Sequence, residues 1–184
     1  MESVWIRHAK KMYSNGHAPE GMPQHDSPIC EDAHKDIREH FEYLLSIVCP
    51  PKIIYTSPFD RARETTDVLL SLLKERGEIC SVEVDPVLGE YLGHQRPRGQ
   101  YADVSWGTLS YIQPRLGVES IENLDNRVSK FLSNHAYDYK AWYVTHGIFI
   151  SKIFQQKTGR KVKFRPLEGV LTKRGKYKIV KLKS

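Results

Sequence analysis

Three short apolar runs along the chain end abruptly at polar residues, which is the pattern of buried strands that deliver polar side chains at their ends. The runs are residues 4–6, 53–55 and 142–144. The polar residues that follow them are Arg7-His8, Thr56-Ser57-Pro58 and Thr145-His146-Gly147, respectively. We therefore expect three buried strands, each followed by polar side chains that can take part in catalysis or ligand binding.

Between and after these strands, apolar residues recur at the three- and four-residue spacing of amphipathic helices. The helical patterns cover residues 33–48, 62–73 and 118–132. Strands that alternate with helices of this length predict an α/β fold, with a mostly parallel sheet and helices on both faces. The chain has 184 residues, 40% of them hydrophobic, which is enough for a single domain over residues 1–184 and leaves little room for a second.

Ligands of such sheets bind beyond the carboxyl ends of the strands. If the three strands are parallel neighbours, then Arg7-His8, Arg61 and His146 meet at one edge of the sheet. Residues 10–27 and 93–111 lack an apolar period, and we interpret them as long loops over that edge.

Two histidines and two arginines at strand ends suit the binding and attack of a phosphoryl group. Arginine donates two hydrogen bonds to phosphate oxygens and stays charged. A neutral histidine nitrogen accepts a phosphoryl group and later releases it, and cationic neighbours keep the ring neutral. Ser57 is predicted to be the N-cap of the second helix, with Pro58 at its first position, so that the amide end faces the anion.

The net charge of +6 is uneven, because residues 159–184 contain ten Lys/Arg and one acid, whereas the preceding residues contain 18 bases and 21 acids. A basic terminus is one feature of nucleic-acid-binding proteins. Over residues 173–183, however, lysines alternate with apolar residues, which is typical of a solvent-facing edge strand. Nucleic acid is therefore the less favoured partner.

The three cysteines are widely spaced, and neither a basic, apolar leader nor a run of ~20 apolar residues is present. We expect a cytoplasmic protein without a membrane partner. Four further histidines, none paired at metal-ligand spacing, are interpreted as loop and helix-surface residues: His17, His25, His34 and His40. The prediction is that the protein has no metal site.

Several segments, in the same order, resemble the motifs of the histidine phosphatase (phosphoglycerate mutase-like) superfamily. Arg7-His8-Ala9 is similar to the family's Arg-His-Gly signature. Residues 56–65 resemble its Ser-Pro turn and phosphate-binding arginine, and residues 143–147 resemble the segment of its second catalytic histidine. Residues 88–93 are similar to the segment that bears the acidic proton donor, and residues 25–29 to the stretch before the first helix.

This resemblance implies that His8 is phosphorylated, that Arg7, Arg61 and His146 hold the phosphoryl oxygens, and that Glu90 protonates the leaving oxygen. It requires no metal or organic cofactor. Lys10, Ser14 and Asn15 are predicted to contact the substrate, since they lie in the loop after the signature. Two other acids near Glu90 remain alternative donors, namely Glu83 and Asp85.

The leading hypothesis is a phosphatase that hydrolyses a phosphomonoester through a phosphohistidine, with a phosphorylated small molecule or phosphoprotein as substrate. The alternatives are a phosphoglycerate-type mutase, and a catalytically weak module that binds phosphate or nucleic acid. The sequence does not select among substrates, and it does not indicate an oligomeric state.

Overall fold

The computed structural model describes residues 2–13, 17, 19–20, 26–91, 119–135 and 140–182. Its strands are β1 (Glu2–Arg7), β2 (Ile53–Thr56), β3 (Ser81–Val84), β4 (Ala141–Thr145), β5 (Gly169–Lys173) and β6 (Lys176–Val180). Its α-helices are α1 (Ala33–Leu45), α2 (Asp60–Glu75), α4 (Ile121–Asn134) and α5 (Gly147–Thr158), and a short 3₁₀ helix, η1, covers Pro86–Leu88.

The strands form one sheet in the order β3-β2-β4-β1-β5-β6. The pairs β2–β3, β2–β4 and β1–β4 are parallel, whereas β5 runs antiparallel to both β1 and β6. The predicted α/β fold with a mostly parallel sheet is thus confirmed. All three strands that were predicted from apolar runs are neighbours in its centre.

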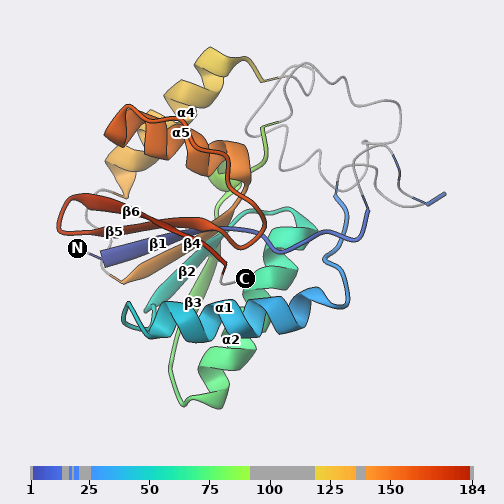
Figure 1. Cartoon of the computed structure of the whole chain (residues 1–184). Helices are drawn as coiled ribbons and strands as arrows, with labels where there is room; N and C mark the ends of the chain where they lie inside the picture. The colour runs from blue at the N-terminus through green and yellow to red at the C-terminus, as the bar shows by residue number, and fades with distance from the viewer. Residues whose placement is uncertain are drawn as a thin grey trace.

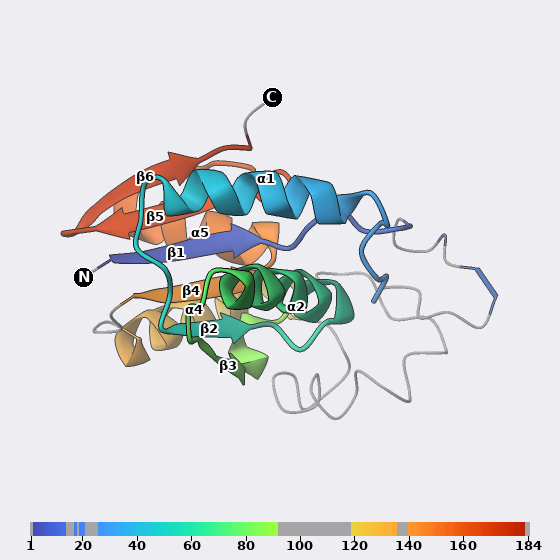
Figure 2. The same ribbon diagram turned by 90° about the horizontal axis from the view of Figure 1, so that it is seen from below.

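Helices cover both faces of the sheet, α4 and α5 on one and α1 and α2 on the other (Figure 1). The view from below shows α1 and α2 side by side on the same face of the sheet, with α2 next to β4 and β2 (Figure 2). Side chains alternate between these layers, as strand geometry requires. On β1, Val4 and Ile6 face the core with α1 and α2, while Trp5 faces the core with α4 and α5.

A row of stacked aromatic rings crosses the three central strands. Trp5 pairs with Tyr143, with ring centroids 3.9 Å apart, and Tyr143 stacks on Tyr55 at 5.3 Å. A slip of one residue would move these rings to the opposite face, so the row specifies the register. That register sets Arg7 opposite Thr145, and therefore places the residues that follow them side by side.

Gly169 allows β5 to approach β1. A Cβ atom at this position would lie 1.7 Å from the carbonyl oxygen of Trp5, so no larger residue fits without moving a strand.

Strand β6 forms one edge of the sheet. Its lysines Lys176 and Lys178 are exposed, which confirms the prediction of a solvent-facing edge strand. None of the helices described in the structure has the length and apolar character needed to cross a bilayer.

Two local predictions were wrong. The N-cap of α2 is Phe59 rather than Ser57, because the Ser57 hydroxyl contacts His146 instead, at 2.8 Å. His40 is not a helix-surface residue, since it is buried on the inner face of α1. Burial lowers the pKa of His40 to about 4, and the neutral ring is accommodated in the core.

Candidate active site

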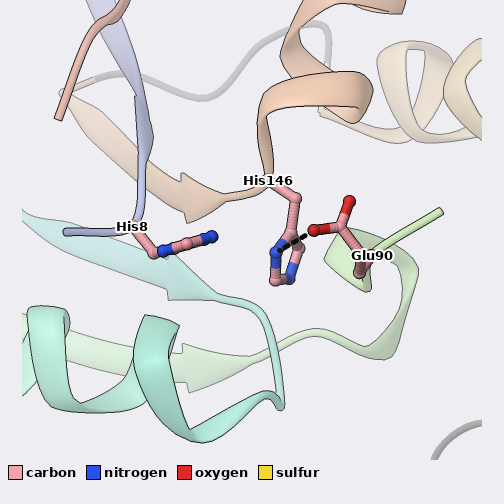
Figure 3. A group of neighbouring side chains, drawn as sticks. All are labelled: His8, Glu90 and His146. Atoms are coloured by element: carbon pink, nitrogen blue, oxygen red, sulfur yellow. Dashed lines mark ion pairs between the residues drawn. The ribbon is translucent and has the colours of Figure 1, made fainter. Parts of the chain in front are cut away.

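The ends of the central strands place two histidines next to each other. His8 directly follows β1, and its backbone N–H donates to the carbonyl of Thr145 at 2.9 Å. His146 directly follows β4. Both rings are fully buried, with centroids 5.2 Å apart, and Glu90 approaches them from the loop after η1 (Figure 3). The predicted convergence at the carboxyl edge of the sheet is therefore present.

The hydrogen bonds of His8 determine which ring nitrogen carries the proton. Nδ1 lies 2.7 Å from the carbonyl oxygen of Ala9. A carbonyl can only accept, so Nδ1 is the protonated nitrogen. Arg61 Nε donates to His8 Nε2 at 3.2 Å, which requires a lone pair on Nε2. Burial and the positive charge of Arg61 lower the pKa of His8 well below its usual value and keep the ring neutral.

Arg61, in the first turn of α2, is the hub of the site. Besides His8, its guanidinium contacts Glu90 Oε2 at 3.4 Å, His146 Nδ1 at 3.2 Å and Asp26 Oδ1 at 3.3 Å. The side chain is 2% exposed. A buried guanidinium with a carboxylate on each of two sides is held in orientation, with its charge directed at the two histidines.

Glu90 and His146 form a close pair in which Glu90 Oε2 lies 3.2 Å from His146 Nδ1. Burial would raise the pKa of Glu90, but the neighbouring His146 and Arg61 outweigh it and hold this pKa below its usual range. Burial lowers the pKa of His146 to about 4. At neutral pH, Glu90 is thus ionised and His146 is neutral.

Arg7, the last residue of β1, approaches the site from the side of α5. Its NH1 donates to the carbonyl of Phe164 at 2.7 Å, and its Nε is buried without a hydrogen-bond partner among the described residues. Gly147 leaves room for this side chain, since a Cβ there would lie 3.2 Å from Arg7 Cδ. A buried N–H without a partner is costly, and a phosphoryl oxygen would satisfy it.

Asp26 is a member of the site that the sequence did not single out. Besides its contact with Arg61, its Oδ1 accepts the backbone N–H of Asp60 at 2.8 Å, at the start of α2. Burial raises the pKa of Asp26 to about 6, although Arg61 lowers it in part. Residues 25–29 had been linked only to the stretch before the first helix. Asp26 and Arg61 are 35 residues apart in the sequence, so no local pattern revealed their contact.

A second missed pair is Arg127 and Glu119. Arg127, on α4, donates to Glu119 and to the carbonyls of Val87 and Gly89. Glu119 precedes α4, which begins at Ile121, so no helical spacing links it to Arg127. The one available signal was an arginine next to Val128, on the apolar side of an amphipathic helix.

The remaining candidate residues lie outside this cluster or outside the described part of the chain. Lys10 is exposed, with Nζ 3.5 Å from Asp32, and its contact with substrate stays a prediction. Neither alternative acid contacts His8 or His146. Glu83 is exposed, and Asp85 caps η1 and contacts His135, which lies at the end of α4. The residues outside the described part are Ser14, Asn15, His25 and the segment 93–111.

A metal ion would find one group of ligands among the described residues. His8, Glu90 and His146 each offer a nitrogen or oxygen atom, and these atoms lie within 4.8 Å of one another. Arg61, however, donates hydrogen bonds to His8 Nε2 and Glu90 Oε2, and its NH2 lies 3.2 Å from His146 Nδ1. A cation would have to compete with the guanidinium for the same lone pairs, whereas an anion would be attracted by it.

The comparison with protein-family models gives a match to the histidine phosphatase superfamily (branch 1) over residues 4–172. The chain belongs to this superfamily. The match includes every strand-end residue of the site, from Arg7 to His146, and the acid Glu90. A comparison with curated protein sequences finds no match.

Several solved structures with a fold similar to that of this chain are named as phosphatases. A putative alpha-ribazole-5'-P phosphatase from Escherichia coli K-12 has a TM-score of 0.64 at 17% identity, covering 100% of this chain and 97% of that one. Ecdysone phosphate phosphatase from Bombyx mori, in complex with tungstate, has a TM-score of 0.64 at 12% identity, with 98% and 92% covered. The putative phosphohistidine phosphatase SixA from Agrobacterium tumefaciens has a TM-score of 0.61 at 13% identity, with 100% and 97% covered.

Proposed function

We propose that this chain hydrolyses a phosphomonoester through a phosphohistidine formed on Nε2 of His8, with Glu90 as the proton donor. The observation that carries the proposal is the state of His8. Its Nδ1–H is bound to the Ala9 carbonyl, its Nε2 keeps a lone pair, and Arg61 lies against that same nitrogen. The nucleophilic nitrogen and a cation suited to bind phosphate oxygens therefore lie next to each other.

In the first step, the phosphoryl oxygens lie against Arg7, Arg61 and His146. The Nε2 lone pair of His8 attacks phosphorus, the bond from phosphorus to the ester oxygen breaks, and Glu90 gives its proton to that oxygen as the alcohol leaves. Positioning and charge neutralisation supply most of the rate in phosphoryl transfer. The Nε–H of Arg7, which has no hydrogen-bond partner among the described residues, supplies one donor for this purpose.

In the second step, water attacks the phosphohistidine, and the Glu90 carboxylate takes a proton from that water. The N–P bond breaks, inorganic phosphate leaves, and the lone pair returns to Nε2 of His8. The same carboxyl group thus acts as an acid and then as a base, as microscopic reversibility allows. Both steps balance without a further reactant.

Glu90 is ionised in the empty site, so its proton has to arrive with the substrate. A phosphoryl group brings negative charge beside the carboxylate and offsets the charge of Arg61, and both effects raise the pKa of Glu90. Binding of phosphate is therefore expected to take up a proton. Calorimetry of phosphate binding in buffers of different ionisation enthalpy measures this uptake, and we expect its loss in Glu90→Gln.

The substrate class we propose is a phosphomonoester of a small molecule or protein. The solved structures of this fold include phosphatases named for an alpha-ribazole phosphate, an ecdysone phosphate and a phosphohistidine. These names have only the phosphoryl group in common. This is consistent with a site whose described residues recognise phosphate and leave the rest of the substrate to the neighbouring segments.

The test is phosphate release from p-nitrophenyl phosphate, compared between the parent protein and His8→Ala across acidic to neutral pH. We expect a loss of about 10⁴-fold or more in His8→Ala. Turnover by the parent should persist well below pH 6.5, since the lowered pKa of His8 keeps the nucleophile unprotonated there. Mass spectrometry after an alkaline quench should find the phosphoryl group on His8.

His40→Gln is the matched control, because His40 is also buried and also has a lowered pKa but lies on α1, away from the pocket. It should keep the parental rate. Absence of turnover by the folded parent on aryl and alkyl esters would refute the proposed hydrolysis. Turnover that survives His8→Ala would refute the phosphohistidine.

A further inference from the structure

The side chain of Arg127 spans two parts of the molecule that are distant in sequence. Nε and NH2 donate to the two carboxylate oxygens of Glu119, Oε1 at 2.7 Å and Oε2 at 2.6 Å. The side chains are 9% and 3% exposed, and the guanidinium lies over the ring of Phe149 at 5.1 Å. This is a bidentate, buried ion pair whose guanidinium has little freedom to rotate.

The third nitrogen of the same guanidinium binds the loop that carries Glu90. NH1 donates to the carbonyl of Val87 at 2.6 Å and to the carbonyl of Gly89 at 2.9 Å. The carbonyl between them, that of Leu88, accepts from the Thr145 hydroxyl at 2.6 Å. Three consecutive carbonyls before Glu90 are thus bound by side chains, which satisfies the groups left open where a 3₁₀ helix ends.

We propose that Arg127, oriented by Glu119, is the positioning residue for the proton donor of this enzyme. The inference rests on the proposed function, since it assigns the pair a role through Glu90. Among the described residues, Arg127 makes no hydrogen bond to His8 or Arg61, and on the side of the site its hydrogen bonds go to the two carbonyls on either side of Leu88. Its charge also contributes to the lowered pKa of His146, but its direct contact with the site is through the loop.

A contribution to folding alone accounts poorly for this arrangement. Two charges removed from water gain little net stability over apolar residues of similar volume, whereas loss of one partner leaves a costly buried charge. What the pair provides that apolar residues would not is a pair of directed N–H groups aimed at two defined carbonyls. Those hydrogen bonds fix the backbone just before Glu90, and therefore the position from which its carboxyl group extends.

A positioning role for the acid predicts a dependence on the leaving group. An alkyl phosphate expels a strongly basic oxygen that needs a proton, whereas p-nitrophenyl phosphate expels a weakly basic one that leaves without it. Misplacing Glu90 should therefore slow the first step of alkyl esters selectively. The ratio kcat/KM reports this step, without the later hydrolysis of the phosphohistidine that both substrates share. A general loosening of the pocket would slow both substrates alike, because both present the same phosphoryl group to His8, Arg7 and Arg61.

The experiment compares the charge-balanced double variant Arg127→Met with Glu119→Leu against the parent on p-nitrophenyl phosphate and glycerol 2-phosphate. Removing both partners leaves no buried charge, and thermal unfolding verifies the fold. We expect kcat/KM for the alkyl ester to fall about 30-fold and kcat/KM for the aryl ester to fall about threefold or less. Arg127→Lys, which retains the charge opposite Glu119, should recover part of the alkyl activity.

Two further variants sharpen the test. Asp125 lies on α4, like Arg127, and its ion pair with Lys152 of α5 has atoms 2.8 Å apart, with 40% of the Asp125 side chain exposed. Asp125→Asn breaks this pair and should leave both rates unchanged. In a Glu90→Gln background, the double variant should cause no further loss on the alkyl ester, because both changes remove the same proton transfer.

Hydrogen exchange of the backbone amides provides a readout that does not depend on turnover. The double variant should exchange faster over residues 87–90 and at the parental rate over residues 144–147. Equal losses on both substrates, or unchanged exchange over residues 87–90, would overturn the inference. A parent that turns over neither ester would refute the proposed function instead, and the exchange result would then decide the positioning of the loop.

Discussion

The residues of the candidate active site are placed in two different ways. His8 and His146 follow neighbouring parallel strands, and their separation is set by backbone hydrogen bonds and by the register of β1 and β4. Glu90 belongs to a loop whose carbonyls accept hydrogen bonds from the side chains of Thr145 and Arg127. His8, the proposed nucleophile, is therefore held by the backbone of the sheet, whereas the loop of Glu90, the proposed proton donor, is held by a small number of side-chain contacts.

Arg61 joins these two regions, and replacing it should have the largest effect of the four changes considered below. Arg61→Lys keeps the charge but loses the planar fork that reaches His8, His146 and Glu90 together. We expect kcat/KM to fall about 10³-fold on both aryl and alkyl phosphates. Steady-state kinetics on the two substrates measures this, and a loss below tenfold on either would contradict the role of Arg61 as the hub.

Arg63→Lys is the matched control for this change. Arg63 lies on the same helix, its side chain is 58% exposed, and its closest acid is Asp60 at 3.9 Å. The substitution should leave both rates within twofold of the parent.

Replacing Asp26 tests whether its carboxylate, in addition to that of Glu90, holds the guanidinium of Arg61 in place. Asp26→Asn keeps the shape but loses the negative charge, and we expect kcat/KM at pH 7.5 to fall about tenfold. The pKa of Asp26 is about 6, raised by burial despite Arg61, with Asp60 and Glu64 nearby. Below this pH the parent's own carboxyl is protonated, so the ratio of parent to variant should approach one at pH 5.

A pH profile of kcat/KM for the two proteins measures that ratio. A ratio that stays constant from pH 5 to 8 would show that the charge of Asp26 does not act on Arg61. A ratio near one throughout would show that the hydrogen bond from the backbone N–H of Asp60 is its whole contribution.

The same contrast explains which parts of the site could be predicted from the sequence. Apolar runs that end in Arg7-His8 and His146 are local signals, and the rule for parallel sheets brings their ends together without further information. The bonds from Asp26 to Arg61 and from Arg127 to the loop join residues far apart in sequence, and no periodicity encodes them. Ser57 illustrates the limit, since its position suits an N-cap but its hydroxyl contacts His146.

Thr145 provides a milder test of the loop side. Thr145→Val removes the hydroxyl that donates to the Leu88 carbonyl and leaves that carbonyl unpaired, at a cost of about 1–3 kcal/mol in stability. The loop should shift while β4 stays in register. We expect kcat/KM for glycerol 2-phosphate to fall about fivefold with little change for p-nitrophenyl phosphate, and chemical denaturation to report the lower stability. Equal losses on both esters would place the defect at the strand ends instead.

Gly147→Ala applies the smallest perturbation, on the strand-end side and two residues away from Thr145. The added Cβ would lie 3.2 Å from Cδ and 3.3 Å from Nε of Arg7, so the arginine has to yield by a few tenths of an ångström. A displacement of a phosphate-binding group should raise KM about fivefold for both esters, because both present the same phosphoryl oxygens. Ile148→Ala, at an exposed position of the same turn, should leave KM unchanged. If Gly147→Ala instead slowed only the alkyl ester, the two regions would not be separable, because a change beside Arg7 would then act through Glu90.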